Sequence, residues 1–302
     1  MGLIDRTISM TLPVVPKPVV RYFSRPYIAG TTMADALNVV RELGEQGATS
    51  TLDVLGEFVS RDEEASANTE AYIKLFKRIE SESVREAHAS VKLTALGLLI
   101  DADRCLENMR QLMHQAEASG NFVRIDMEDS SCTDKTLAIY RRLREEFGHH
   151  RVGAVFQSRL HRTLADVDEH AVQGANFRLC KGIYLEPESI AYTDDRRIRK
   201  NFVEALDRMF GSGVFVGIAT HDDWLVEESI RLIGKHGLMR DRYEFQMLLG
   251  VREPLRRQLI ADGHRLRVYV PFGANWYAYS VRRLRENPQI AGHVFRALVG
   301  RG

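Results

Sequence analysis

The feature that most constrains the fold of this chain is a regular alternation of short apolar segments with longer amphipathic ones. The short segments are rich in β-branched and apolar residues, a composition that predicts strands. They cover residues 50–55, 90–95, 122–127, 152–157, 176–181, 214–220, 243–248 and 266–270. Eight strands alternating with helices over about 250 residues predict an α/β fold, a (β/α)8 barrel of the TIM type. A doubly wound open sheet has the same alternation and is the alternative.

Several residues indicate where the intervening helices begin and end. Gly148 closes the apolar pattern of 136–147, Asp222 precedes 224–233 as an N-cap residue, and Pro254 lies in the first turn of 253–262. An additional helix is predicted at 35–46, and the proline-rich residues 1–30 predict an irregular arm. We expect one domain over residues 1–302, in which residues 1–46 form an N-terminal arm and an extra helix.

Composition and charge exclude several classes of protein. The formal net charge of +1 gives no bulk attraction to nucleic acid. The three cysteines, Cys105, Cys132 and Cys180, lack the spacing of a zinc site, so we expect free thiols, a reducing compartment and no metal. No apolar run approaches the roughly 18 residues that span a bilayer, and no signal peptide is apparent. We therefore expect a cytoplasmic protein with at most peripheral contact with the inner membrane.

Polar residues lie on one alternating face of several predicted strands, although barrel interiors are mostly Val, Ile and Leu. They are Ser90, Lys92 and Thr94, then Arg124 and Asp126, then Asn176 and Arg178, then Arg267 and Tyr269. Their apolar neighbours can pack on the surrounding helices, so the polar faces must point into the barrel. Burying a lone charge is costly, and we therefore expect these groups to have partners or a ligand. A purely structural Arg124–Asp126 ion pair is the alternative for the third strand.

Polar side chains also occur at the C-terminal ends of nearly all the strands, where barrel active sites are built. They are Glu57, Asp126, Glu128, Gln157, Lys181, Thr220, His221, Asp222 and Gln246. The pattern predicts an enzyme whose site lies at this face. Each residue alone also has a structural explanation. Gln157 could cap the barrel layer, and His221 could be a surface residue beside a helix N-terminus.

A helical pattern follows the last strand at 275–287. Tyr279, Arg282 and Arg283 stand at positions i, i+3 and i+4, so they share one helix face. An aromatic ring beside two guanidinium groups makes a compact site for a carboxylate or a phosphate. A solvated basic face is the alternative, because Arg285 follows closely.

A set of short motifs occurs here in an order that resembles one known family. They are Leu-Asp-Val-Leu-Gly-Glu (52–57), Val-Lys-Leu-Thr-Ala-Leu-Gly (91–97), Arg-Ile-Asp-Met-Glu (124–128), Phe-Gln-Ser (156–158), Arg-Leu-Cys-Lys-Gly-Ile-Tyr (178–184), Ala-Thr-His (219–221), Glu-Phe-Gln-Met-Leu (244–248), Tyr-Val-Pro-Phe-Gly (269–273) and Tyr-Ser-Val-Arg-Arg-Leu-Arg-Glu-Asn (279–287). The ordered set resembles the monofunctional, FAD-dependent proline dehydrogenases from near Tyr27 to the C-terminus. The resemblance implies a distorted barrel whose last helix lies over the C-terminal face and which has an N-terminal helical arm.

The resemblance also implies a role for each site residue. Lys92, Arg282 and Arg283 would bind the proline carboxylate, and Glu57 would pair with Arg282 and gate the pocket. Tyr269, Tyr279, Leu179 and Tyr184 would shape the proline pocket. Asp126 and Arg178 would be catalytic, with Arg178 near flavin N5 and Asp126 orienting Lys92. Met127, Gln157, Arg178, Lys181, Gly182, Ile183, Thr220, His221 and Gln246 would bind FAD. Ile183 departs from the family pattern, in which we expect a small residue such as Ala.

The implied reaction is the oxidation of L-proline to Δ1-pyrroline-5-carboxylate, the first step of proline catabolism, with hydride transfer to N5 of FAD. A quinone would accept the electrons, which implies transient contact with a membrane. The basic arm residues Arg6, Lys17, Arg21 and Arg25 are the candidates for that contact. Transient contact with pyrroline-5-carboxylate dehydrogenase is also implied.

Two other functions are compatible with parts of the sequence. Lys92 could be the covalent nucleophile of a Schiff-base lyase, with loops at Gly250 or Gly273 binding a phosphate. A proline-responsive DNA regulator without enzymatic activity is the second, although a net charge near zero and the lack of a helix-turn-helix pattern argue against it.

Overall fold

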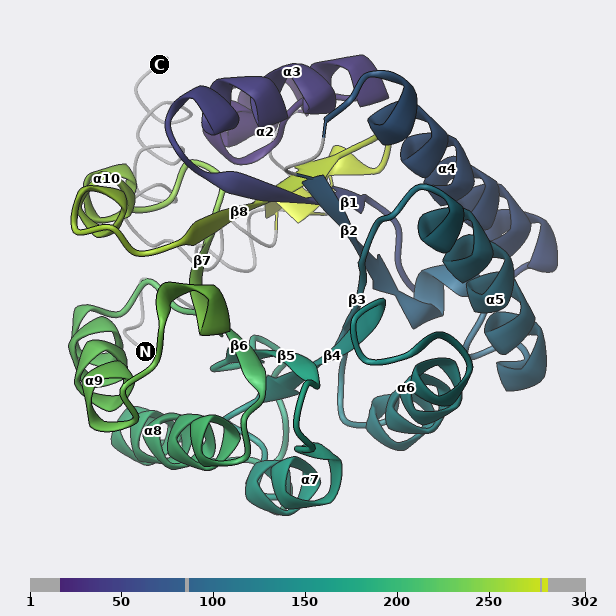
Figure 1. Ribbon diagram of the computed structural model, residues 1–302. Coiled ribbons are helices and arrows are strands. Elements are labelled where there is room, and N and C mark those ends of the chain that lie inside the picture. Colours follow the sequence, from purple (N-terminus) through teal and green to yellow (C-terminus); the bar gives the residue numbers. More distant parts are fainter. Residues whose placement is uncertain (1–16, 85–86, 278, 282–302) are drawn as a thin grey trace, which may run out of the picture.

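Eight parallel strands form a closed barrel in the computed structural model, which describes residues 17–84, 87–277 and 279–281 (Figure 1). The strands are β1 Thr49–Val54, β2 Ala87–Lys92, β3 Val123–Asp126, β4 Val152–Gln157, β5 Asn176–Cys180, β6 Phe215–Ala219, β7 Tyr243–Leu248 and β8 Leu266–Phe272. Each strand pairs with the next in sequence, and β8 returns to pair with β1. The predicted barrel is therefore confirmed, and the closure of β8 on β1 excludes the open sheet.

A ring of helices surrounds the strands. The helices that follow β1 to β7 are α4 Asp62–Ser81, α5 Ala102–Ala118, α6 Thr133–Phe147, α7 Thr163–His170, α8 Asp195–Gly211, α9 Asp223–Lys235 and α10 Glu253–Ala261. The extra helix α3, Met33–Glu45, precedes β1 and packs on both β1 and β8, between α10 and α4 in the ring (Figure 1). It thus occupies the position in the ring where the helix after β8 would pack.

The described part of the N-terminal arm is helical, as the family resemblance implied, although the prolines of residues 1–30 favoured an irregular segment. Residues Lys17–Ser24 form helix α2, and Arg25–Tyr27 continue it as a 3-10 turn, η2. Pro18 is compatible with this helix because it lies in the first turn, where its missing N–H costs no hydrogen bond. The ammonium of Lys17 lies 5.7 Å from the centre of the Tyr277 ring. The arm therefore packs against the segment that follows β8.

The second strand lies three residues earlier than predicted. Strand β2 covers Ala87–Lys92, and Leu93–Leu96 turn into a 3-10 helix, η3, that ends at Gly97 with a φ of 95°. Because Gly97 adopts this left-handed conformation without strain, the chain can turn sharply here. Lys92 is consequently the last strand residue and lies at the C-terminal edge, while Thr94 is buried in η3 rather than on the strand.

The three predicted helix boundaries are confirmed. Gly148 ends α6 with a φ of 85°, and Pro254 lies in the first turn of α10. Asp222 is the N-cap residue of α9, but its side chain makes no capping hydrogen bond. Its carboxylate instead binds Lys181 and Arg199, since charge-assisted bonds are stronger than a bond to a neutral backbone N–H.

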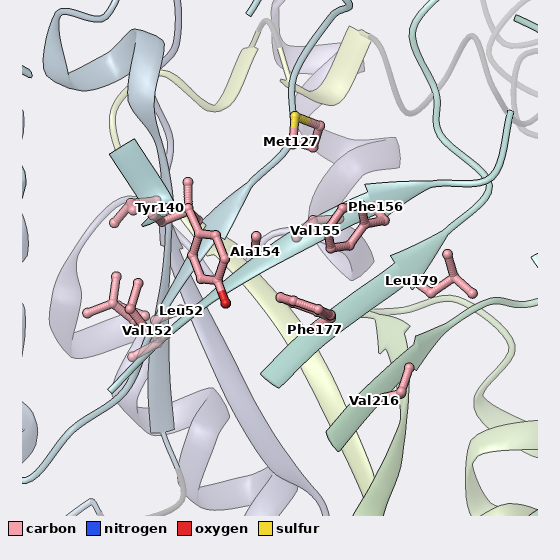
Figure 2. Close-up of a cluster of buried hydrophobic side chains, with 14 of the residues drawn as sticks. Leu52, Met127, Tyr140, Val152, Ala154, Val155, Phe156, Phe177, Leu179 and Val216 are labelled. Carbon is pink, nitrogen blue, oxygen red and sulfur yellow. The ribbon is translucent and has the colours of Figure 1, made fainter. Parts of the chain in front are cut away.

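Apolar side chains fill the layer between the strands and the helices. Figure 2 shows part of this layer around β4 and β5, where Phe156 and Phe177 pack with ring centres 4.8 Å apart. The interior of the barrel carries the polar faces of the strands, as predicted. Among the described residues, no helix is both long and apolar enough to cross a membrane.

Candidate active site

The C-terminal ends of the strands surround a cavity of about 700 Å³, which is within the range of about 300–1,000 Å³ typical of small-molecule sites. Most of the predicted site residues line it. They are Lys92, Asp126, Met127, Gln157, Arg178, Lys181, Gly182, Ile183, Tyr184, Thr220, His221, Gln246, Tyr269 and Tyr279. Residues from seven strand ends thus meet at one face, as the sequence predicted.

Asp126 is the centre of a buried hydrogen-bond network in this cavity. Its Oδ1 accepts from Ser90 Oγ at 2.7 Å and from Arg178 Nη1 at 2.5 Å. Its Oδ2 accepts from the Tyr269 hydroxyl at 2.8 Å. Burial, then the charge of Asp126, raises the pKa of Tyr269 well above its usual value, so the phenol keeps its proton. The Arg178 guanidinium lies over the Tyr269 ring, 5.4 Å from its centre, which fixes both side chains.

Lys92 is held by Asp53, a residue that the sequence did not mark as functional. Lys92 Nζ lies 2.8 Å from Asp53 Oδ2 and 3.3 Å from the Tyr269 hydroxyl. Burial alone would lower the pKa of Lys92, but the carboxylates of Asp53 and Asp126 raise it above its ordinary value. Asp53 is the direct ion-pair partner, because Asp126 is engaged by Arg178 and the Tyr269 hydroxyl lies between Asp126 and Lys92. Lys92 is therefore a protonated ammonium group.

Glu128 ties the end of β3 to the loop that follows β1. Its carboxylate accepts from the Thr94 backbone N–H at 3.0 Å and from the Thr94 hydroxyl, whose oxygen accepts from the Phe58 backbone N–H at 2.9 Å. Burial raises the pKa of Glu128 to about 7. Phe58 has a φ of 53°, an unfavourable conformation for a bulky residue. These bonds hold the strained loop that carries Glu57.

A cluster of charges borders the cavity at the ends of β5 and β6. Asp222 Oδ2 accepts from Lys181 Nζ at 2.6 Å and from Arg199 Nε at 2.7 Å. Burial would raise the pKa of Asp222, but the hydrogen bonds from Arg199 and Lys181 outweigh it and lower the pKa. Asp195 lies 3.4 Å from Lys181 Nζ and 3.9 Å from Arg199 Nε, so two carboxylates accompany the two cations. The two basic side chains can still donate hydrogen bonds to a phosphate or carboxylate group of a ligand.

Gly182 brings bare backbone to the cavity wall. Its φ is 93°, and a Cβ atom built there would lie 2.5 Å from Gln157 Oε1. The Gln157 amide is itself fixed, since its Nε2 donates to the Glu128 carbonyl at 2.7 Å. A glycine is thus required for both conformation and space, and it allows close approach of a ligand. The neighbouring Ile183 is 44% exposed and lies at the mouth.

Three of the remaining residues predicted to bind the cofactor have well-defined hydrogen bonds. The Thr220 hydroxyl accepts from the Asp222 backbone N–H at 3.2 Å. The Leu248 backbone N–H donates to His221 Nε2 at 2.9 Å, which makes that nitrogen an acceptor. The Gln246 amide accepts from Arg178 Nε and donates to Glu244 at 2.7 Å. These bonds fix the side chains around the cavity.

Leu179 was wrongly assigned to the proline pocket. Its side chain is completely buried in the apolar layer outside the barrel, in the same cluster as Phe156 and Phe177 (Figure 2). The reason is the alternation along β5, because Arg178 and Cys180 on either side face the cavity. The alternative of a structural Arg124–Asp126 pair is excluded, since Arg124 binds Asn176 and the Ala154 carbonyl instead.

The structure describes only some of the remaining predicted site residues. Arg282 and Arg283 lie outside the described residues, so their predicted contact with a carboxylate stays a prediction, as does the pairing of Arg282 with Glu57. Glu57 follows β1 and is half-buried. Tyr279, from the same predicted helix, is 7% exposed and lines the cavity.

The residues that sequence reasoning missed are mainly the partners of those it found. Asp53 pairs with Lys92, and Glu244 pairs with Arg267 at 2.7 Å between Nε and Oε1. Both carboxylates stand among apolar residues in predicted strands, and that pattern could have marked them as inward-facing. Arg199 gave no such indication, since it is one of several basic residues on α8.

The geometry is suited to a small zwitterion beside a larger ligand. The protonated Lys92 lies beside the neutral phenol of Tyr269, and its ammonium group can bind a carboxylate. The basic side chains of Lys181 and Arg199 and the bare backbone of Gly182 line the same cavity. Substrate and cofactor sites can therefore share this space.

Comparison with known proteins points to one family. The sequence profile described as "Proline dehydrogenase" matches residues 36–296. The chain is 34% identical to the proline dehydrogenase of Deinococcus radiodurans over 95% of this chain and 96% of that protein. It is 36% identical to proline dehydrogenase 2 of Bacillus subtilis over 90% and 88% of the two chains.

Solved structures share the fold. The crystal structure of proline utilization A (PutA) from Bdellovibrio bacteriovorus superposes with a TM-score of 0.82 at 24% identity. The match covers 88% of this chain but 32% of that one, so this chain spans about a third of the longer protein. Because the identity is low, this likeness shows the barrel fold alone.

Proposed function

This chain belongs to the proline dehydrogenase family, and we propose that it oxidises L-proline to Δ1-pyrroline-5-carboxylate with FAD as cofactor and a quinone as electron acceptor. The observation that carries the proposal is the Lys92–Asp53 pair beside Tyr269. It keeps a protonated cation at a cavity wall where an amino-acid carboxylate can bind. The same observation argues against the Schiff-base alternative, because a nucleophilic lysine needs a lowered pKa and that of Lys92 is raised.

The residues present fit FAD. Lys181 and Arg199 offer positive charge for a diphosphate, and Gly182 leaves space that a side chain would fill. Met127 and Gln157 offer an apolar surface and an amide at adjacent strand ends. When bound, FAD accepts a hydride at N5. A cation near N5, the role proposed for Arg178, favours the reduced, anionic form.

The protein groups around the substrate have distinct proposed roles. Lys92, with Arg282 and Arg283, binds the proline carboxylate and so fixes the ring in one orientation. The Tyr269 phenol stays protonated and donates its one hydrogen to Asp126, so its ring forms part of the pocket wall. Asp126 holds Arg178 and Tyr269 in place through its two carboxylate oxygens.

An anaerobic absorbance spectrum tests substrate and cofactor together. We expect the purified protein to be yellow and its visible flavin band to bleach on addition of L-proline. A colourless protein that does not bind added FAD would overturn the cofactor, and a yellow protein that proline does not bleach would overturn the substrate. Lys92→Met should retain the flavin and raise the proline concentration needed for bleaching.

The electron acceptor and partners are further parts of the proposal. The exposed apolar side chains Ile183 and Leu185, 44% and 96% exposed, follow β5 near the cavity mouth and suit a quinone. Reduction of a soluble quinone no faster than of dioxygen would contradict this. We also propose transient contact with a membrane through the basic arm and with pyrroline-5-carboxylate dehydrogenase. Unchanged liposome binding after deletion of residues 1–16 would contradict the role of that part of the arm.

A further inference from the structure

A second, smaller cavity lies at the opposite, N-terminal end of the barrel and has no role in the proposed reaction. Its volume is about 130 Å³. The charged and titratable residues that line it are Arg124, Arg178, Arg265, Arg267, His88 and Glu244. Four guanidinium groups thus face a space that contains one carboxylate.

The positive charge of this cavity is only partly balanced. Arg267 Nε lies 2.7 Å from Glu244 Oε1. Arg178 Nη1 lies 2.5 Å from Asp126 Oδ1, on the side of the larger cavity at the C-terminal strand ends. Within the described ranges, neither Arg124 nor Arg265 has a carboxylate at ion-pair distance. Within those ranges Arg124 and Arg265 thus have no direct carboxylate partner, and Glu244 is the one described carboxylate that lines this small space.

Of these two arginines, Arg124 is the one whose charge is more costly to leave unpaired, because the residue is only 3% exposed. Its Nη1 donates to the carbonyls of Ala154 at 3.0 Å and Asn176 at 2.6 Å, and its Nη2 donates to the Asn176 side chain. These oxygens satisfy its N–H groups without neutralising its charge. Burial, then the charge of Arg178, lowers the pKa of Arg124 to about 9. An isolated buried cation is costly, so a nearby anion would stabilise the fold.

The backbone makes room for this arginine at a fixed position. A Cβ atom at Gly153 would lie 2.4 Å from Arg124 Nη1 and 2.1 Å from the Asn176 carbonyl oxygen. The guanidinium therefore occupies space that a side chain on β4 would otherwise fill. Gly153 on β4 therefore allows the Arg124 guanidinium to lie beside the cavity.

The other polar groups that line the cavity, His88 and Glu244, can bind water. Burial, then the charges of Arg267 and Arg124, lowers the pKa of His88 well below its usual value, so the ring is neutral and offers one N–H donor. Glu244 Oε2 is buried and, among the described residues, accepts no hydrogen bond. A water molecule takes up about 30 Å³ in the liquid. The cavity can therefore hold a small ion together with a few water molecules, one of which can donate to Glu244.

We propose that this cavity binds a small monovalent inorganic anion, for which chloride is the probe, between the guanidinium groups of Arg124, Arg265 and Arg267. The anion supplies the missing counter-charge, and water separates it from Glu244. The site is independent of the proposed substrate and cofactor, and its main effect is on stability.

Thermal unfolding of the flavin-loaded protein in sodium chloride and in sodium gluconate of equal ionic strength tests the proposal. Gluconate is much bulkier than chloride, so we expect the midpoint to be higher in chloride by about 1–2 °C, the shift that corresponds to about 1 kcal/mol for a chain of 302 residues. Arg265→Gln, at the exposed edge of the cavity, should lose most of this difference. Arg257→Gln, whose side chain is 69% exposed on α10, is the matched control and should keep it.

A second variant tests the proposal independently in case Arg265→Gln does not fold. His88→Asp places a carboxylate inside the cavity, so it should remove the chloride response while preserving the fold. Crystals soaked in bromide should show anomalous density between Arg124 and Arg267. An empty cavity in bromide, or a chloride response equal in the wild type and in His88→Asp, would overturn the proposal.

Discussion

Replacing Asp53 by asparagine should strongly destabilise the protein, because it leaves the buried Lys92 ammonium without its direct counter-charge. Asp53 is completely buried, and its Oδ2 lies 2.8 Å from Lys92 Nζ. At an effective dielectric constant of about 20, opposite unit charges at this distance attract by about 6 kcal/mol. Desolvation offsets part of that attraction. Removing one partner of a buried pair typically costs about 3–5 kcal/mol, and we expect the lower end because asparagine keeps one oxygen.

Urea denaturation at neutral pH measures this loss. The exposed pair of Lys74 and Glu70 on α4, 3.2 Å apart and 63% and 65% exposed, provides the control. Glu70→Gln should cost about 0.3–0.5 kcal/mol, as is usual for such surface pairs. The double variant Asp53→Asn with Lys92→Met should be more stable than the sum of the single effects predicts, because it leaves no unpaired buried charge.

The same substitution should change the pH dependence of proline binding. The pKa of Lys92 is raised in the fold, so the stability it contributes is fully present below the ordinary lysine pKa of 10.5 and is lost as the pH rises through the higher folded value. Without Asp53 the pKa of Lys92 falls. The KM for proline should then begin to increase at a lower pH than in the wild type.

Three results would refute this reasoning. One is an Asp53→Asn cost as small as that of Glu70→Gln. Another is strict additivity in the double variant, which would mean that Asp53 and Lys92 are not coupled. The last is an unshifted KM profile, which would mean that the charge of Lys92 does not bind the substrate.

Three further predictions concern other parts of the molecule. Leu179→Ala should cost about 2–5 kcal/mol in denaturation and leave the KM for proline unchanged, since Leu179 lies in the core; a raised KM at full stability would restore its predicted pocket role. Glu128 has a folded pKa of about 7 against an ordinary 4.5, so its contribution to stability is greatest below pH 4.5 and falls as the pH rises through 7. Glu128→Gln should flatten that slope, by up to about 3 kcal/mol across the range, and an unchanged pH–stability curve would count against it. Gly182→Ala should weaken FAD binding in a fluorescence titration, because its Cβ would meet Gln157, and an unaltered affinity would show that the backbone does not approach the cofactor.

The sequence alone determined the barrel and the face that carries the site. Strands and helices differ in the period of their apolar residues, and that period is local, so the eight strands could be located with errors of a few residues. The inward faces of Asp126, Arg178 and Tyr269 followed from simple alternation along each strand. Parallel strand ends meet at one face of a barrel, which brought distant motifs together without coordinates.

Only the tertiary structure decided which groups pair. Lys92 could be placed inside the barrel from its strand, but its partner Asp53 is 39 residues away and was fixed by the register between β1 and β2. Asp222 was predicted as an N-cap residue and is one, but its carboxylate binds Lys181 and Arg199, which the closure of the barrel placed beside it. Periodicity tells which way a side chain points, whereas ion pairs depend on distances of a few ångströms across the barrel, and those exist only once the cylinder has closed.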